Sequence, residues 1–329
     1  MPVLFRRSSA PTGTQEAAPS RTFSGESTAG VVGAEPTASM WRRWRAFTHA
    51  DARRDGVPTW LADVIWVTPI VGTLLLGALY LTRRDAYYAV LREDWPVEWA
   101  QFALLLFIAV LATITAARIR KHGALIVGLL LTVALGALAL AGEEISWAQR
   151  ALAFGTPPTL SEVNQQSEFN IHNIQSGSVP LQSIFKLFSF VLAVAGVTLA
   201  LLTRGPRPRL QGAFWSRLAV PSYTIVGSLT MIGYWAVVVV APISPVVRYQ
   251  EWAEVSLYLA LAGYVYAIFA RHTLRGSGPV IAGRPTRDPI DTSALVALAV
   301  VVALTVVLAA LTAYHGIIPE NAPEVRHLG

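Results

Sequence analysis

The stretch that decides the fold runs from Gly123 to Arg150 and reads GALIVGLLLTVALGALALAGEEISWAQR. Its first part, residues 123–141, carries no charge and matches the roughly twenty residues that a helix needs to cross a bilayer. Two adjacent carboxylates, Glu143 and Glu144, follow directly. Charged groups are costly near hydrocarbon, so their presence there calls for a reason. The stretch predicts a membrane helix that ends in a polar site.

The composition of the whole chain is that of a membrane protein. Of its 329 residues, 53% are hydrophobic and 14% are charged, whereas soluble domains carry about 25% charged residues. Because backbone polar groups must be satisfied within each segment in lipid, long apolar windows are predicted to be helices. Seven windows are long enough to span: 60–82, 97–117, 123–146, 181–203, 218–241, 251–270 and 293–314. We therefore predict an all-α polytopic membrane protein with seven transmembrane helices in a membrane domain at residues 59–316.

The distribution of basic residues predicts the orientation of these helices. Residues 1–58, 118–121, 204–217 and 271–291 together hold 19 of the 26 Lys and Arg residues. The positive-inside rule places such segments in the cytoplasm. The N-terminus is then cytoplasmic and the C-terminus extracytoplasmic.

The same orientation places a long extracytoplasmic loop at residues 147–180 and a short extracytoplasmic tail at 317–329. We expect a multi-pass protein of the plasma (inner) membrane. The net charge of +6 favours membrane lipids as partners over nucleic acid, because anionic lipid headgroups attract basic segments. Arginine greatly outnumbers lysine and cysteine is absent, which favours a bacterial source and excludes disulfides and thiolate metal sites.

Residues 1–58 are expected to be a disordered basic cytoplasmic tail, since most of them cannot bury enough apolar surface to repay ordering. Within it, residues 41–47 read WRRWRAF and alternate basic and aromatic side chains. This pattern suits a short interfacial helix lying on the inner leaflet. A plain basic flank of the first span explains the pattern equally well.

Glu143 and Glu144 are the first candidates for a functional site. They repel each other and lie at a helix C-terminus, where the helix dipole disfavours a carboxylate. The pair therefore needs a compensating cation, a bound metal ion or a bound proton. Arg150 lies two helical turns beyond Glu143 if the helix continues. A structural salt bridge between them, with Trp147 as an interfacial anchor, is the alternative explanation.

His172 is the second candidate, in the run Asn170-Ile171-His172-Asn173 with Glu168 four residues earlier. A histidine near carboxylates can act as a general acid or base, or can bind a divalent metal with ligands from several helices. At the start of the sixth window, the i,i+3 spacing of Glu251 and Glu254 puts both on one helix face. Ordinary helix-start electrostatics explains Glu251, and Glu98 at the start of the second window.

We assign hypothetical roles on this basis. Glu143, Glu144 and His172 are predicted to be catalytic, with a divalent metal left open as a cofactor. The predicted substrate-binding residues are Arg150, Gln149, Asn164, Gln166, Glu168, Asn170, Asn173 and Glu254.

The motif pair Glu143-Glu144-Ile145-Ser146-Trp147-x-Gln149-Arg150 and Asn170-x-His172-Asn173 resembles one seen in a group of uncharacterised bacterial multi-pass membrane proteins. The likeness covers about thirty residues, and Ala148 stands where that group is expected to have glycine. The resemblance implies no activity. It implies that the two segments belong to one site on the outer face.

Three functions remain open at this point. The first is an envelope enzyme that acts on a lipid or lipid-linked substrate, in which Arg150 binds an anionic head group. The second is a non-catalytic membrane subunit or scaffold that docks a protein partner through its outer face. The third, a channel or transporter, is disfavoured because the middle thirds of the seven windows lack Asp, Glu, Lys, Arg and His, which ion-coupled carriers usually have there.

Overall fold

The computed structural model describes residues 39–92, 96–121, 123–164, 167–176, 179–204, 208–210, 212–273 and 291–315. The chain divides into two units, Met1–Ser39 and Met40–Gly329, and every element named here belongs to the second. Residues 1–38 of the predicted tail, the tail at 317–329 and the candidate Gln166 lie outside the described residues.

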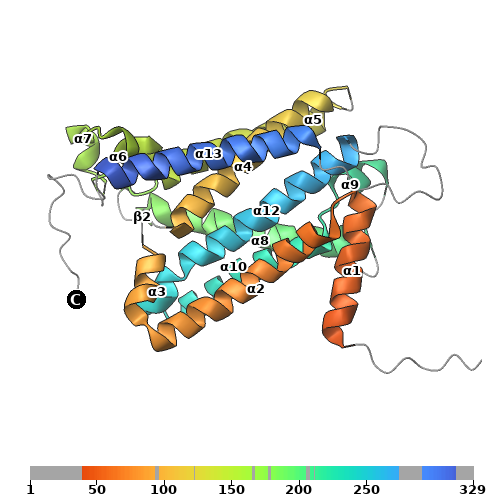
Figure 1. The fold of residues 1–329 in the computed structure, drawn as a ribbon, viewed down its shortest axis with the longest axis horizontal. Coiled ribbons are helices and arrows are strands. Elements are labelled where there is room, and N and C mark those ends of the chain that lie inside the picture. Colours follow the sequence, from red (N-terminus) through yellow and green to blue (C-terminus); the bar gives the residue numbers. More distant parts are fainter. Residues whose placement is uncertain are drawn as a thin grey trace, which may run out of the picture. The chain divides into compact units, whose positions relative to one another are not determined.

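Seven helices among the described residues are long and apolar enough to cross a membrane, which confirms the predicted fold class. They are α2 (Thr59–Thr82), α4 (Pro96–Arg118), α5 (Ala124–Glu144), α8 (Leu181–Arg204), η2 with α10 (Ser222–Thr224 and Ile225–Val240), α11 with α12 (Ser244–Arg248 and Gln250–Thr273), and α13 (Thr292–His315). Successive spans run in opposite directions, so the terminus of each span lies at one of the two ends of the bundle (Figure 1).

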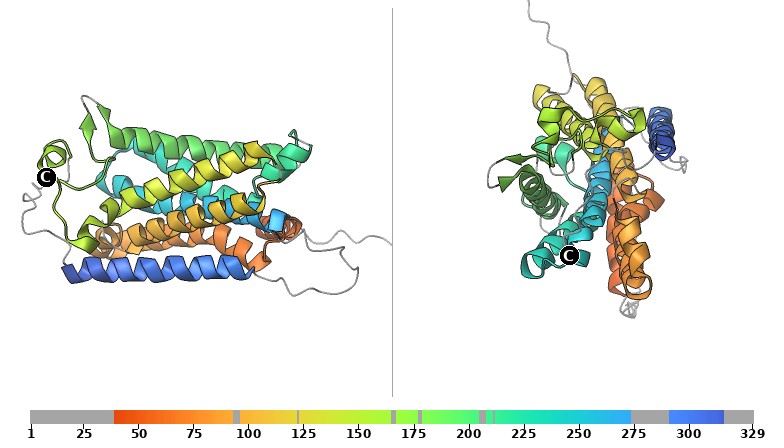
Figure 2. Two further views of the ribbon diagram at one scale, coloured as in Figure 1. Left: turned by 90° about the horizontal axis from the view of Figure 1, so that it is seen from above. Right: turned by 90° about the vertical axis from the view of Figure 1, so that its left-hand side faces the viewer.

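Helix α12 lies at the centre of the bundle, with α4, α10 and α2 packed around it. Its apolar window is 78% buried, compared with 17% for α13. Helices α5 and α13 pack on the outside of α4, and α8 packs mainly on α10 (Figure 2). Because the window of α8 is only 11% buried, most of its surface is left for lipid and for the pocket described below.

Helices α10 and α12 approach each other closely at Gly227. A Cβ atom built on this glycine would lie 2.2 Å from the backbone oxygen of Ser256. Real side chains do not tolerate such a distance, so the contact requires a residue without a side chain. Gly227 therefore fixes the separation of the two helices.

At one end of the bundle, called here the Arg271 end, α1 (Met40–Asp55) packs against α2, η2 and α12. The expectation of a disordered tail over residues 1–58 is wrong for Met40–Asp55, which form a helix that includes the segment expected as a possible helix at 41–47. Its last turns are held by buried charge: the Asp55 carboxylate accepts hydrogen bonds from Arg204 at 2.5 Å and from Arg271 at 2.8 Å. The short helix α9 (Ala213–Leu218) lies at the same end.

The opposite end, called here the His172 end, carries the smaller elements. They are α3 (Arg84–Val90), η1 (Ser146–Ala148), α6 (Gln149–Leu152), α7 (Pro158–Ser161) and the antiparallel strands β1 (Gln175–Ser176) and β2 (Val179–Pro180). The long loop between α5 and α8 contains all of these except α3. This loop covers the ends of the spans where the candidate residues lie (Figure 1).

Candidate functional site

The site begins where α5 stops. Ser146, Trp147 and Ala148 all have left-handed backbones, with φ angles of 46°, 53° and 62°. Each such residue costs about 1–2 kcal/mol when it carries a Cβ. The turn folds the Trp147 ring back over Gly142, where an added Cβ would lie 2.9 Å from ring atoms. The chain therefore leaves the direction of α5 at once, close to the predicted end of this span at residue 146, and the helix does not continue to Arg150.

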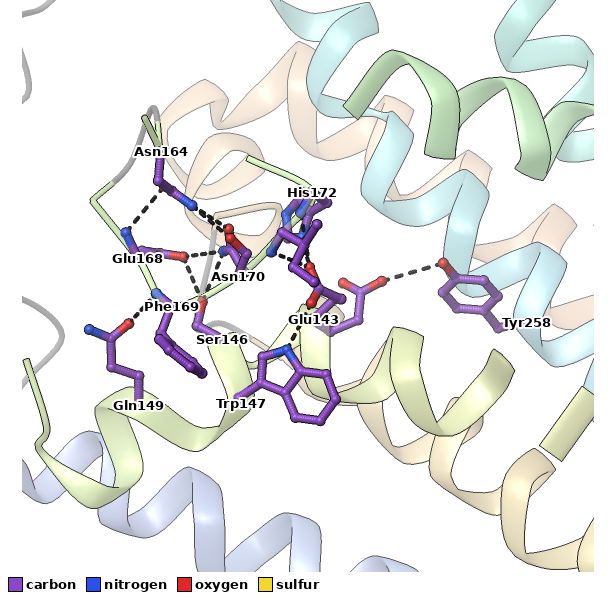
Figure 3. A network of polar contacts seen from close by, with 12 residues as sticks. Glu143, Ser146, Trp147, Gln149, Asn164, Glu168, Phe169, Asn170, His172 and Tyr258 are labelled. Carbon is purple, nitrogen blue, oxygen red and sulfur yellow. Dashed lines mark hydrogen bonds and ion pairs between the residues drawn. The ribbon is translucent and has the colours of Figure 1, made fainter. Parts of the chain in front are cut away.

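Glu143 is the anchor of the long loop. Its Oε1 accepts a hydrogen bond from the Trp147 indole nitrogen at 2.7 Å. Its Oε2 accepts hydrogen bonds from the backbone N–H groups of Ile171 at 2.6 Å and His172 at 2.9 Å (Figure 3). The His172 Nδ1 lies 3.3 Å from the same oxygen. A buried carboxylate with this many donors is well satisfied, so its geometry is that of a structural acceptor.

The amide side chains of the loop form a second network behind Glu143. Asn164 donates to both the backbone and the side-chain oxygen of Asn170, at 2.9 and 2.8 Å. Asn170 donates in turn to Ser146 at 3.1 Å and to Glu168 at 2.9 Å. Ser146 also donates to Glu168 at 2.7 Å (Figure 3). These groups are buried and bonded to each other, which holds the loop in one conformation.

Arg150 and Gln149 belong to the same internal network. Arg150 forms a close ion pair with Glu168, and both side chains are largely buried. Gln149 accepts a hydrogen bond from the backbone N–H of Phe169 at 2.7 Å and donates to Thr156 at 2.7 Å. The alternative of a Glu143–Arg150 salt bridge is therefore wrong, because the left-handed turn sends Arg150 to Glu168. Trp147 bonds to Glu143 itself.

Beside the loop lies a pocket with a cavity volume of about 100 Å³. Its walls come from α4, α5, α8, α12 and the loop. The polar lining includes Glu144, His172, Lys186, Glu251, Glu254 and Tyr258. Phe185, Phe188 and Leu192 add an apolar wall from α8. The pocket is therefore polar on the side of α5 and α12, and partly apolar on the side of α8.

Glu144 lines this pocket and is bonded to α12 rather than to the loop. The Tyr258 hydroxyl donates to its Oε1 at 3.3 Å, and its charge interacts with those of Glu254 and Glu251. Glu254 accepts a hydrogen bond from Gln250 at 2.8 Å and interacts electrostatically with Lys186. The two adjacent glutamates of the motif thus face different surroundings, one in the loop network and one in the pocket.

His172 lies at the boundary between the loop network and the pocket. Its ring contacts Glu143 through Nδ1 and meets the ring of Phe185 edge-on, with 6.5 Å between centroids. It also lines the pocket, and its side chain is 27% exposed. The imidazole therefore reaches the pocket while its backbone is fixed by Glu143.

The structure brings some of the predicted residues to the pocket and others to the loop interior. Glu143, Glu144, His172, Glu168, Asn170, Asn173 and Glu254 all line the pocket, whereas Arg150, Gln149 and Asn164 do not. Within the described ranges, no group of three or more His, Asp and Glu side chains is placed to hold a metal ion.

Sequence reasoning missed Lys186 and Tyr258. Lys186 is one of only two lysines in the chain and lies inside an apolar span, which is a signal for a functional residue. Tyr258 lies two turns into α12 and had no such signal, because a tyrosine in a span is ordinary.

Comparisons of the chain with protein-family models, with curated proteins and with solved structures found no match. The architecture agrees with a multi-pass membrane protein, and the resemblance of the motif pair to a bacterial group stays a prediction.

Proposed function

We propose that this chain is an integral membrane enzyme that acts on a lipid or lipid-linked substrate, whose polar head enters the pocket at the His172 end. The observation that supports this best is the two-sided lining of the pocket. Carboxylates of α5 and α12 form one wall, and Phe185, Phe188 and Leu192 of α8 form another. An amphiphile can place its head among the carboxylates and its chain along the exposed surface of α8.

The charge of the pocket defines the kind of head group. Glu144, Glu251 and Glu254 face a single lysine, Lys186, across the pocket. Arg150, which we expected to bind an anionic head group, is instead paired with Glu168. The pocket therefore suits a head group that offers hydroxyl or amino donors, and repels one whose accessible part is anionic.

Glu144 and Glu254 are the proposed proton-transfer pair. One carboxylate removes a proton from the attacking hydroxyl or water. The new bond to the attacking oxygen forms as the bond from the head-group centre to the leaving oxygen breaks, and the other carboxylate, in its acid form, protonates the leaving oxygen. The proton then passes from the first carboxylate to the second, which restores both for the next cycle. His172 is the proposed partner that contacts the head group from the loop side. Glu143 is then a positioning residue, since its oxygens are already bonded to the loop.

We also propose that the Arg271 end faces the cytoplasm of a bacterial cell and that the pocket opens on the outer side of the plasma membrane. The support is the concentration of basic residues in the segments that join spans at the Arg271 end. Because the chain has no cysteine, single cysteines at Thr159 and at Ser277 can be tested in intact cells with an impermeant thiol reagent. We expect the reagent to label Thr159→Cys and not Ser277→Cys. Labelling of Ser277→Cys alone would show that the protein has the opposite orientation.

The enzymatic proposal is tested with purified full-length protein and a polar lipid extract, followed by mass spectrometry. We expect the wild type to consume one lipid class and Glu144→Gln to leave it unchanged. Glu162→Gln is the matched control, because Glu162 is an exposed carboxylate of the loop between α5 and α8 and does not line the pocket. A Glu144→Gln protein that is folded and consumes the lipid at the wild-type rate would contradict the proposal.

A second function, the docking of a protein partner, is favoured by the surface of the long loop. Leu152 is 63% exposed and Ile171 53% exposed, and Trp147 and Val163 are also exposed. Exposed apolar side chains on a polar loop are typical of an interaction surface. Replacement of Leu152 and Ile171 by serine should release a co-purified partner and leave lipid turnover intact if docking is a separate property.

A further inference from the structure

Two glutamines at the His172 end donate hydrogen bonds to the two glutamates of α12. The Gln101 Nε2 atom donates to the backbone oxygen of Glu251 at 2.9 Å and to its Oε2 at 3.1 Å. The Gln250 Nε2 atom donates to the Oε1 of Glu254 at 2.8 Å. An amide nitrogen donates and does not accept, so each of these contacts favours the ionised form of the carboxyl group.

Glu144, at the end of α5, has a different kind of partner. The Tyr258 hydroxyl lies 3.3 Å from its Oε1, and a hydroxyl group can accept a hydrogen bond as well as donate one. The contact is therefore retained when Glu144 carries a proton, because the carboxylic acid then donates to the tyrosine oxygen.

The charges around the two carboxyl groups also differ. Glu144 interacts with the like charges of Glu254 and Glu251. Glu254 interacts with Glu251 as well, but it also has the ammonium group of Lys186 as a counter-charge. When carboxylates share a site, repulsion leaves one of them with its proton. Glu144, which faces like charges, retains that proton more readily than Glu254, which faces a lysine.

We propose that Glu144 is the acid and Glu254 the base of the proton-transfer pair, and that Gln250 is the positioning residue that keeps Glu254 ionised. This assignment rests on the proposed function of the pocket. Glu254 takes the proton of the attacking hydroxyl or water as the oxygen of that group forms its new bond. The bond to the leaving oxygen breaks, and this oxygen takes the proton of Glu144. The proton then passes from Glu254 to Glu144, which restores both groups.

Gln250 is itself held by a residue of α10. The Tyr234 hydroxyl donates to the Oε1 of Gln250 at 3.2 Å, and both residues are buried. With its oxygen toward Tyr234, the amide presents its nitrogen to Glu254. In the reversed orientation, the amide oxygen would face Glu254, and only a protonated Glu254 could bond to it. The orientation of this amide therefore determines which carboxyl group can be the base.

Other titratable groups line the pocket from the elements around it. They are Glu98 of α4, Glu143 of α5, Glu168 and His172 of the loop, and Lys186 of α8. Glu98 lies in the first turn of α4, where the helix dipole favours the ionised form. Glu143 accepts hydrogen bonds from the loop backbone, and Glu168 is paired with Arg150. These carboxylates are therefore weaker competitors for the proton than Glu144.

The test reads protonation directly, by infrared spectroscopy of the full-length protein in dodecyl maltoside, a detergent without ester carbonyls. A protonated carboxyl group has a C=O band separate from those of carboxylates and amides. At pH 7 we expect this band in the wild type and its loss in Glu144→Gln, a change that keeps the shape of the side chain. A wild type without the band, or a Glu144→Gln protein that retains all of it, would overturn the assignment.

Gln250→Leu tests the positioning role, because it removes the N–H donor from Glu254 without changing the charge of the pocket. The acid band should then grow at a pH about one unit higher than in the wild type, since a hydrogen bond to a charged group has that value. Gln182→Leu is the control, at another glutamine that lines the pocket, and should titrate as the wild type does. An unchanged titration in Gln250→Leu, or an equal shift in Gln182→Leu, would also overturn the proposal.

These spectra do not depend on turnover, so the two proposals can fail separately. The expected bands in a protein that consumes no lipid would refute the enzymatic function and support the location of the proton on Glu144. Lipid turnover by a wild type whose acid band persists in Glu144→Gln would refute the assignment alone.

Discussion

The Trp147 indole donates a 2.7 Å hydrogen bond to the carboxylate of Glu143, four residues earlier, although a left-handed turn separates the two. In a continuing α-helix, these positions would merely be neighbours on one face. Here the turn lays the indole over Gly142. As a result, Glu143 is directed to the loop and Glu144 to the pocket.

The left-handed backbone at Ala148 predicts a stabilising substitution. With φ at 62°, Ala148 carries the cost of a Cβ in a conformation that glycine adopts freely. Ala148→Gly should raise the free energy of unfolding by about 1 kcal/mol, visible as a higher melting temperature in detergent. Ala151→Gly, in the right-handed helix α6, is the control and should be destabilising. A lower melting temperature for Ala148→Gly would argue against this backbone conformation.

Substitution of Glu143 and substitution of Glu144 are predicted to have different effects on the loop. Glu143→Gln loses charge-assisted hydrogen bonds from Ile171 and His172, each worth about 1.5–3 kcal/mol. Its loop should therefore exchange amide hydrogens faster and be cut more readily by protease. Glu144→Gln should leave amide exchange of the loop at the wild-type rate, because Glu144 contacts Tyr258 and the pocket. Equal loosening of the loop in both variants would refute this division.

Gly227 is predicted to be intolerant of a side chain. Gly227→Ala places a methyl group 2.2 Å from the Ser256 oxygen, so α10 and α12 must separate. We expect a loss of about 1–3 kcal/mol in stability, measured by thermal unfolding. Gly233→Ala is the matched control in the same helix, because its Cβ would meet nothing within 4 Å. That variant should be unchanged or slightly stabilised.

The ion pair of Asp291 at the Arg271 end predicts that the stability of the folded state depends on pH. Burial tends to raise the pKa of its carboxyl group, but hydrogen bonds from Arg118 and Ser293 outweigh this and lower the pKa from 3.8 to about 2. The folded state therefore binds this proton less readily than the unfolded state. The stabilisation by Asp291 is present above about pH 4 and is lost as the pH falls toward about 2.

The measurement compares the melting temperatures of wild type and Asp291→Asn at pH 7 and pH 3. The variant should be less stable at pH 7, because it loses the ion pair with Arg118 at 3.0 Å. The difference should become smaller at pH 3, where the wild-type carboxylate begins to be protonated. Asp85→Asn, at an exposed residue of α3, controls for general charge effects. A difference that grows on acidification would contradict the sign of the prediction.

The spans and part of the pocket can be predicted from the sequence. Long apolar windows leave no alternative to helices in lipid. The alternation of basic segments places the end of α5 and the start of α12 at the same end of the bundle. Glu144 and Glu254 are therefore expected at the same end of the bundle from the sequence alone, and both line the pocket.

The turn after α5 and the length of α1 depend on three-dimensional contacts that short sequence patterns do not encode. No glycine marks the left-handed turn at Ser146–Ala148, so the pairing of Arg150 with Glu168 was unpredictable. Helix α1 is longer than its basic and aromatic motif because Asp55 meets Arg271, 216 positions later. A pattern read within a short window cannot detect such a partner.

This distance has a consequence for biosynthesis. Arg271 is near the end of the sixth span, so the ribosome has made nearly the whole membrane domain before Asp55 receives its bidentate partner. A nascent chain stopped before α12 lacks the contacts of α1 with α12, and Arg204 is then the partner that remains for Asp55. Truncations that end before residue 271 should therefore be recognised by quality-control proteases at α1, far from the cut itself.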